Sequence, residues 1–214
     1  MAAEAAHLAE HFHDRETQAH ASRLGMWIFL GTEVLLFAGL FVGYAYYRFQ
    51  FGPAWAEASR HLDTTLGTVE TVDLITSSMF AAMSLHFAHK KKHGLATLML
   101  AITILMGLAF LGLHAKEYLD EFREGALPGR YYHLTDGAAP PLRGMSMFFS
   151  LYFLTTGLHG LHVTIGCVVL AYCAVRAGKG HFSAEYDTPL ENGALYWHLV
   201  DLIWIFVYPL YYLV

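Results

Sequence analysis

Two pairs of ionisable side chains, each spaced three residues apart, interrupt apolar segments in the second half of the chain. His159 and His162 lie in the segment 157–163, and His198 and Asp201 lie in an aromatic segment that runs to the C-terminus. Side chains at i and i+3 share one face of a helix. In hydrocarbon an unpaired ionisable group is costly, so we expect His198 to donate to Asp201 and each pair to need further shelter.

A single carboxylate, Glu33, lies in a third apolar segment, and the residues from Leu30 to Phe37 offer it no cation on the same helix. We expect Glu33 to be neutral or paired with a group on another helix. Two interpretations stay open. Glu33 is either a carboxyl that handles protons or faces a lipid headgroup, or a protonated acid that hydrogen-bonds a neighbouring helix.

Ligation of haem or copper is a second possible chemistry for the histidines. Those in or beside apolar segments are His86, His89, His114, His159, His162 and His198. Three of them, His86, His89 and His114, lie at predicted helix ends, where histidine is ordinary. The acid beside His198 does not resemble a pair of imidazoles facing each other on two helices. We therefore expect hydrogen bonding within the protein or to lipid, with no metal or cofactor bound by this chain, and a haem-bearing membrane cytochrome is the alternative.

The composition places these groups in a membrane. Of 214 residues, 56% are hydrophobic and only 14% are charged, against about 25% charged in soluble domains. The net charge of −5 and a single short basic block, Lys90–Lys92, argue against nucleic acid as a partner. Cys167 and Cys173 are six positions apart on one predicted helix, about 9 Å, which is too far for a disulfide. The sequence predicts an all-α polytopic transmembrane bundle.

Five segments are long and apolar enough to span a bilayer, which needs roughly 20 residues per helix. They are 24–47, 69–88, 95–114, 145–175 and 194–214, and together they form one domain over 24–214. Residues 1–23 form a polar, His-rich tail, which we expect to be solvated and not a cleaved signal. Residues 115–144 are too polar to span and are predicted to be a surface loop. Because Lys90–Lys92 crowd a short loop on the side of the tail, the N-terminus is predicted to be cytoplasmic.

Several separated motifs resemble subunit III of the haem-copper cytochrome oxidases. They are Gly-Leu-His-Gly-Leu-His-Val at 157–163, Tyr-Trp-His-Leu-Val-Asp-Leu-Ile-Trp at 196–204, Gly-Met-Trp-Ile-Phe-Leu at 25–30 leading to Glu33, Ala-Lys-Glu-Tyr at 115–118 and His-Phe at 181–182. They occur in the family's order and cover residues 23–214. The resemblance is therefore specific.

The resemblance implies an inner-membrane subunit of a bacterial terminal oxidase of the cytochrome c type, without a redox centre of its own. It implies packing against subunit I, which holds haem and copper, with subunit II, which can hold copper, and subunit IV as further partners. The implied roles are support of proton uptake, preservation of the oxidase and binding of phospholipid. The proton-uptake or lipid-facing candidates are Glu33, His159, His162, His198 and Asp201. The interface or lipid candidates are Trp27, Glu117, Tyr118, Trp197 and Trp204.

One departure from the family pattern concerns the number of spans. Many members have seven, and the two absent here form one wall of the family's lipid cleft. We expect that cleft to be open or to be closed by another subunit. Shorter relatives accompany cytochrome c oxidases, quinol oxidases and nitric oxide reductases, so a quinol oxidase subunit and a nitric oxide reductase accessory remain alternatives.

Overall fold

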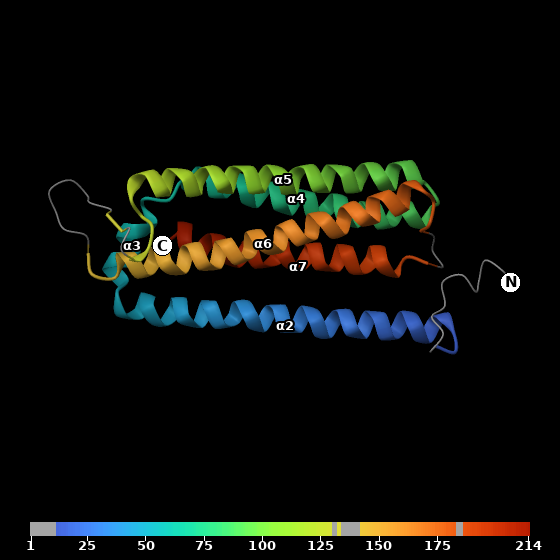
Figure 1. The fold of residues 1–214 in the computed structure, drawn as a ribbon, viewed down its shortest axis with the longest axis horizontal. Coiled ribbons are helices and arrows are strands. Elements are labelled where there is room, and N and C mark those ends of the chain that lie inside the picture. Colours follow the sequence, from blue (N-terminus) through green and yellow to red (C-terminus); the bar gives the residue numbers. More distant parts are fainter. Residues whose placement is uncertain (1–11, 130–131, 134–141, 183–185) are drawn as a thin grey trace.

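The computed structural model describes residues 12–129, 132–133, 142–182 and 186–214. Within them the chain forms six helices and no strand. The helices are α2 (Arg15–Gln50), α3 (Gly52–Ser59), α4 (Thr64–His89), α5 (His93–Glu124), α6 (Met145–Gly178) and α7 (Thr188–Tyr212). The five long helices run along a common axis, and the short α3 lies at the end of the bundle that holds the C-terminus (Figure 1). The predicted all-α class is confirmed.

Local sequence signals fix several helix ends. Asp14 caps α2, and its carboxylate accepts a hydrogen bond from the backbone N–H of Thr17 at 2.6 Å. This bond favours the ionised form and lowers the pKa of Asp14 below its ordinary value. Asp63 caps α4 in the same way. α5 ends at Gly125, whose φ of 84° lies in the left-handed region that glycine tolerates.

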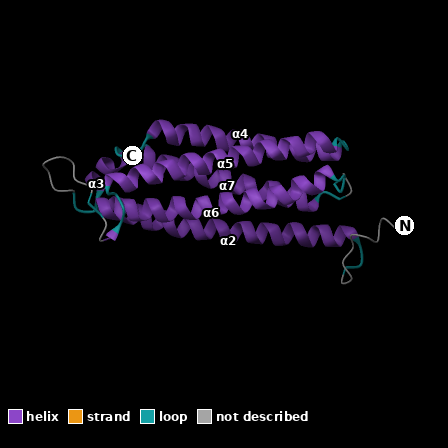
Figure 2. Cartoon of the chain, turned by 45° about the horizontal axis from the view of Figure 1, so that its top comes forward, coloured by secondary structure: helices purple, strands orange, loops and turns teal. Residues whose placement is uncertain are grey.

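Four helices, α2, α5, α6 and α7, are long and apolar enough to cross a membrane. α4 falls short because Glu70, Asp73 and several hydroxyl side chains dilute it. It has 26 residues, about 39 Å of helix, and lies beside α5 (Figures 1 and 2). Glu70, Ser77 and Ser84 are fully buried, so these polar groups of α4 face the bundle interior.

The helices extend beyond the predicted apolar spans. α2 begins at Arg15, so part of the tail predicted to be solvated is helical, whereas His7 and His11 lie outside the described residues. α5 continues ten residues past His114, and the start of the predicted loop 115–144 is therefore wrong. The helix α3 was not predicted. Hydropathy marks where a helix leaves the apolar region and not where it ends, which explains these differences.

α2 lies at the edge of the bundle, set off from the other long helices in Figure 1. Only 11% of its most apolar stretch is buried, against 50% for α7. Its buried residues, Leu30, Phe37 and Tyr44, recur every seven positions and form one narrow stripe toward α6 and α7. Large apolar side chains such as Leu35 and Val42 are exposed. Most of α2 therefore presents an apolar surface to its surroundings.

The remaining long helices pack closely around tryptophan. Trp197 on α7 is fully buried against glycines of two other helices. A Cβ atom on Gly107 of α5 would lie 2.5 Å from Trp197 Cη2, and one on Gly166 of α6 would lie 2.8 Å from Trp197 Cε3. Glycine is thus required at both positions for α5, α6 and α7 to meet around this indole.

Candidate functional site

Glu33 pairs with His162 across the contact between α2 and α6. Glu33 Oε2 lies 2.8 Å from His162 Nε2, and His162 Nδ1 lies 2.7 Å from the carbonyl oxygen of Leu158. A carbonyl only accepts, so Nδ1 carries a hydrogen and donates to Leu158. Between Nε2 and the carboxyl there is then one proton, held either by Glu33 or by an imidazolium. We expected Glu33 to be neutral or paired with a group on another helix, and the pairing is confirmed.

The surroundings of this pair are mostly aromatic. The ring of Phe37 meets His162 edge-on at a centroid distance of 5.3 Å, and the ring of Tyr196 stacks on it at 6.5 Å. The side chains of Glu33 and His162 are 15% and 10% exposed. The pair is thus nearly enclosed, with a small opening at the side of α2.

His159 does not join His162, although the two share a helix face in the sequence pattern. His159 is fully buried between the rings of Phe110, at 5.4 Å, and Trp204, at 5.0 Å. Neither ring nitrogen has a hydrogen-bond partner among the described residues. α6 turns His162 toward α2 and His159 toward α5 and α7, so their shared helix face does not give them a common partner.

His198 and Asp201 are linked through α4 and not directly. His198 Nδ1 lies 2.5 Å from the hydroxyl oxygen of Ser78, and the same hydroxyl interacts with the carboxylate of Asp201. A relay in which His198 donates to Ser78 and Ser78 donates to Asp201 fits both contacts. The expected direct bond between His198 and Asp201 is replaced by this serine, which the sequence pattern did not indicate.

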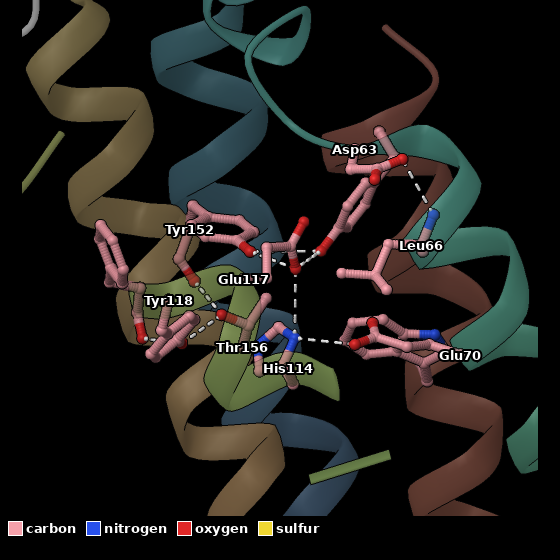
Figure 3. A network of polar contacts seen from close by, with 12 residues as sticks. Asp63, Leu66, Glu70, His114, Glu117, Tyr118, Tyr152 and Thr156 are labelled. Atoms are coloured by element: carbon pink, nitrogen blue, oxygen red, sulfur yellow. Dashed lines mark hydrogen bonds and ion pairs between the residues drawn. The ribbon is translucent and has the colours of Figure 1, made fainter. Parts of the chain in front are cut away.

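A second polar cluster, which the sequence analysis missed, lies between α4, α5, α6 and α7 near the end that holds α3 (Figure 3). His114 Nδ1 is 3.6 Å from Glu70 Oε1 and 3.4 Å from Glu117 Oε2. The hydroxyls of Tyr152 and Tyr212 donate to Glu117 Oε2 at 2.9 and 2.6 Å. We call Glu70, His114 and Glu117 the carboxylate–histidine cluster, and all three are buried.

The sequence contained part of the signal for this cluster. His114 and Glu117 are three positions apart, the same spacing that identified the other pairs, but His114 was placed at a helix end. That placement is wrong, because α5 runs on to Glu124 and buries His114. Glu70 was not singled out, since it lies at the start of the weakest apolar segment, 69–88. Its full burial on α4 is a property of the packing.

The structure also locates the interface and lipid candidates. Trp27 is 62% exposed on α2. Trp197 and Trp204 are fully buried and donate to Ser77 and Thr71 on α4, so they serve the packing of this chain and not its outer surface. Glu117 is buried in the cluster. Tyr118 is partly buried beside Thr156, whose hydroxyl is 2.5 Å away.

Apolar grooves flank α2. One of 470 Å³ lies between α2 and α7 and includes Trp27 and His198, and one of 230 Å³ continues it past Phe37. A third, also of 230 Å³, lies on the other side, between Phe29 and residues of α6 and α7 such as Ile165. The space on both sides of α2 is therefore only partly filled by side chains of this chain.

Polar contacts join α2 to α6 and α7 at three levels along its length. Near its start Arg23 donates to Glu191 at 2.9 Å, and near its end the hydroxyl of Tyr44 donates to a backbone carbonyl of α7. The pair of Glu33 and His162 lies between them. α2 is thus held to the bundle by its narrow buried stripe and by these spaced polar contacts.

Comparison with known proteins gives one family. The family described as "Cytochrome c oxidase subunit III" matches residues 1–214. The chain is 33% identical over 209 residues to cytochrome c oxidase subunit 3 of Balaenoptera musculus, covering 92% of this chain and 70% of that protein. It is 33% identical over 199 residues to the Sus scrofa protein of the same name, covering 87% and 67%. Cytochrome bo(3) ubiquinol oxidase subunit 3 of Pseudomonas aeruginosa is 29% identical over 211 residues, covering 97% and 92%.

Proposed function

The chain belongs to the cytochrome c oxidase subunit III family and is thus a subunit of a haem-copper oxidase, and we propose that it binds phospholipid and supports proton uptake there. In this proposal it preserves the oxidase during turnover and carries out no electron transfer itself. The haems and copper reside in subunit I, with copper also in subunit II. The direct partner is subunit I, with subunits II and IV as further neighbours.

The separation of α2 from the bundle is the observation that carries the lipid-binding role. Apolar grooves lie on both sides of this helix. Polar contacts hold the helix to α6 and α7 at three levels. Acyl chains match the apolar lining, and the bilayer supplies them at high concentration. Trp27 at the rim of the larger groove is an amphipathic side chain suited to the headgroup level.

The shared proton of Glu33 and His162 supports a role in proton uptake. The carboxyl and the imidazole are in direct contact, so a proton can move between them without a bridging group. Both side chains keep a small exposed fraction, 15% for Glu33 and 10% for His162, through which the pair can exchange a proton with its surroundings. Such a pair can store and release one proton during turnover.

The proposed topology has five spans, with α4 as the fifth, in a bacterial inner membrane. α4 has 26 residues, and its length of about 39 Å exceeds a hydrocarbon core of about 30 Å. Its buried polar residues face other helices, which makes its low hydropathy compatible with spanning. The turn Lys90–Lys92 and the start of α2 lie at the same end of the bundle (Figure 1), and we place that end in the cytoplasm.

Two substitutions at Glu33 separate the proton role from the lipid role. In Glu33→Gln the amide still donates to Nε2 of His162 but exchanges no proton. We expect normal lipid content with faster loss of activity over many turnovers and a lower proton stoichiometry. In Glu33→Val the contact itself is lost, and we also expect less phospholipid to co-purify with the oxidase.

The matched control is Thr32→Val, because Thr32 is the exposed neighbour and its hydroxyl bonds within its own helix. It should match the unsubstituted chain in lipid content and durability. If both Glu33 variants also match it in phospholipid count, activity over turnovers and protons per electron, neither role belongs to this site.

The electron donor in the proposal is cytochrome c. The relatives include both a cytochrome c oxidase subunit and a ubiquinol oxidase subunit, so quinol is the second candidate. Purifying the intact oxidase and measuring which reduced donor it consumes decides between them. Co-purification with a nitric oxide reductase, or a Soret band in the isolated chain, would overturn the assignment to an oxidase without a redox centre in this subunit.

A further inference from the structure

The carboxylate–histidine cluster contains lone-pair donors that no hydrogen bond reaches. Both carboxylate oxygens of Glu70, one oxygen of Glu117 and both nitrogens of His114 are buried without a hydrogen-bond partner among the described residues. Buried polar atoms are nearly always satisfied, and they cost several kcal/mol each when they are not. Three adjacent buried side chains therefore have acceptor atoms without a hydrogen-bond partner in the described part of the chain, which favours a bound ligand that all three share.

The spacing of these atoms fits ligands of one ion better than partners in a hydrogen bond. His114 Nδ1 is 3.6 Å from Glu70 Oε1, which has no hydrogen-bond partner among the described residues, and 3.4 Å from Glu117 Oε2, the oxygen that also accepts from Tyr152 and Tyr212. N–H···O bonds are about 2.7–3.2 Å long, so both distances are too great. Ligands bound at roughly 2.0–2.2 Å around a tetrahedral cation lie about 3.4–3.6 Å apart. The ligand atoms of all three residues also lie within 4.8 Å of one another.

We propose that Glu70, His114 and Glu117 bind one divalent cation with the coordination chemistry of Zn²⁺. Two carboxylates neutralise its charge, which matters in a buried site where a net charge is costly. One imidazole and two carboxylates form a three-ligand set that leaves a fourth position for water. The ion is redox-inactive and joins α4 to α5. It is independent of the proton and lipid roles proposed at α2.

The residues around the cluster resemble the outer shell of a metal site. Tyr152 and Tyr212 donate to Glu117 and fix the orientation of its carboxylate, as second-shell donors do. The ring of His114 stacks on Phe110, with an angle of 7° between the planes, and meets Trp204 edge-on. Two of the three side chains that would hold the ion, Glu117 and His114, are thus positioned before it binds (Figure 3).

A polar pocket gives an ion access to the cluster. The pocket has a volume of 350 Å³, and Glu117 forms part of its wall. Five of its lining residues are acidic, against one lysine, one arginine and one histidine. A surplus of carboxylates at a narrow entrance raises the local concentration of cations. Glu117 lies seven positions from the end of α5, about 10 Å, so the distance from the pocket to the site is short.

The experiment uses the oxidase purified with this chain in place. Metal is removed with a chelator, Zn²⁺ alone is added back, and binding per chain is measured by calorimetry and mass spectrometry. We expect one additional zinc per chain, bound by nitrogen and oxygen ligands at about 2.0–2.1 Å in X-ray absorption spectra. Glu70→Gln and His114→Gln should each weaken binding by on the order of 100-fold or more.

Glu121→Gln is the matched control. Glu121 lies one turn from Glu117 on α5, is also buried and also has an oxygen without a partner, but lies outside the cluster. Glu121 also lines the access pocket, so its charge helps to attract the ion but is not part of the ligand set, and Glu121→Gln should weaken binding far less than Glu70→Gln does. If the ligand variants do not assemble, Tyr212→Phe removes one outer-shell donor and should weaken binding by about 10–100-fold. The proposal is overturned if no additional zinc binds, or if Glu121→Gln weakens binding as much as Glu70→Gln does.

Discussion

Glu33 on α2 and His162 on α6 lie 2.8 Å apart although 129 positions separate them in the chain. Because His162 uses its other nitrogen to hold the carbonyl of Leu158, the position of the imidazole is fixed from its own helix. The carboxylate then fixes α2 to that imidazole. One side-chain contact therefore sets both the protonation of the pair and the distance between α2 and the bundle.

A double-mutant cycle between these two residues should reveal strong coupling. Glu33→Val leaves an imidazole nitrogen without a partner, and His162→Phe leaves a nearly buried carboxyl without one. Each single change should cost about 1–3 kcal/mol of stability, since the unpaired partner bears the desolvation penalty. The double variant removes both polar groups and should cost about as much as one single change.

The measurement is the unfolding of the purified subunit complex in denaturing detergent, followed by loss of helix and of subunit association. Leu35→Ala on the exposed side of α2 is the control and should have little effect. If the stability losses of the two single variants simply add in the double variant, the contact between Glu33 and His162 does not hold α2.

The sequence predicted the need for a partner at Glu33 but not the partner's identity. A carboxylate within an apolar helix must be paired, which follows from the hydrocarbon around it. Which of several histidines provides the pairing depends on how α2 and α6 are rotated about their axes. The pattern i, i+3 could not decide this, because His159 and His162 diverge to different neighbours of the same helix.

The span boundaries and the carboxylate–histidine cluster show a second limit of prediction from the sequence. The apolar part of each helix was predicted closely, whereas the polar extensions of α2 and α5 were not. The error at α5 hid His114, since a histidine at a helix end needs no burial. Trp197 and Trp204 were expected at an interface, but both are fully buried. For Trp197 the space beside Gly107 and Gly166 on other helices decides this, and single-sequence spacing carries no information about that space.

Gly107→Ala should destabilise the contact between α5 and α7. The new Cβ would lie 2.5 Å from Trp197 Cη2 and 2.9 Å from the sulfur of Cys167, and the surrounding helices leave neither atom room to move. Overpacking of this kind costs about 1–3 kcal/mol. The same change at Gly112, five positions along α5, meets nothing within 4 Å.

Gly112→Ala should be neutral or stabilising by up to about 1 kcal/mol, because alanine is the better helix former. Thermal unfolding and tryptophan fluorescence of the two variants provide the comparison. Equal stability of both would contradict the tight packing of Trp197 between α5 and α6.

Ser78→Ala should disconnect α4 from the polar groups of α7. The change removes the hydroxyl that contacts His198 and interacts with Asp201, and leaves both groups in an apolar environment. Loss of such a buried partner costs about 1–3 kcal/mol. Thr76→Ala is the control, since the hydroxyl of Thr76 donates to a carbonyl of its own helix. Comparable unfolding of the two variants would show that the serine does not link the helices.

The first turn of α2 should loosen in acid, because its cap depends on an ionised side chain. The bond from the Thr17 N–H lowers the pKa of Asp14 in the folded chain below the ordinary value of 3.8. A group whose pKa is lowered by folding contributes stability above its unfolded pKa and loses it as the pH falls through its folded pKa. The cap should therefore be intact at neutral pH and lost only below the ordinary pKa of Asp14.

Hydrogen exchange at the first amides of α2 measures this loss of the cap, relative to the intrinsic exchange rate at each pH. Asp14→Asn keeps an oxygen that caps the helix but does not titrate, so its protection should not change over the same range. If the aspartate and the asparagine chains lose protection together in acid, the loss arises elsewhere in the bundle and not at the cap.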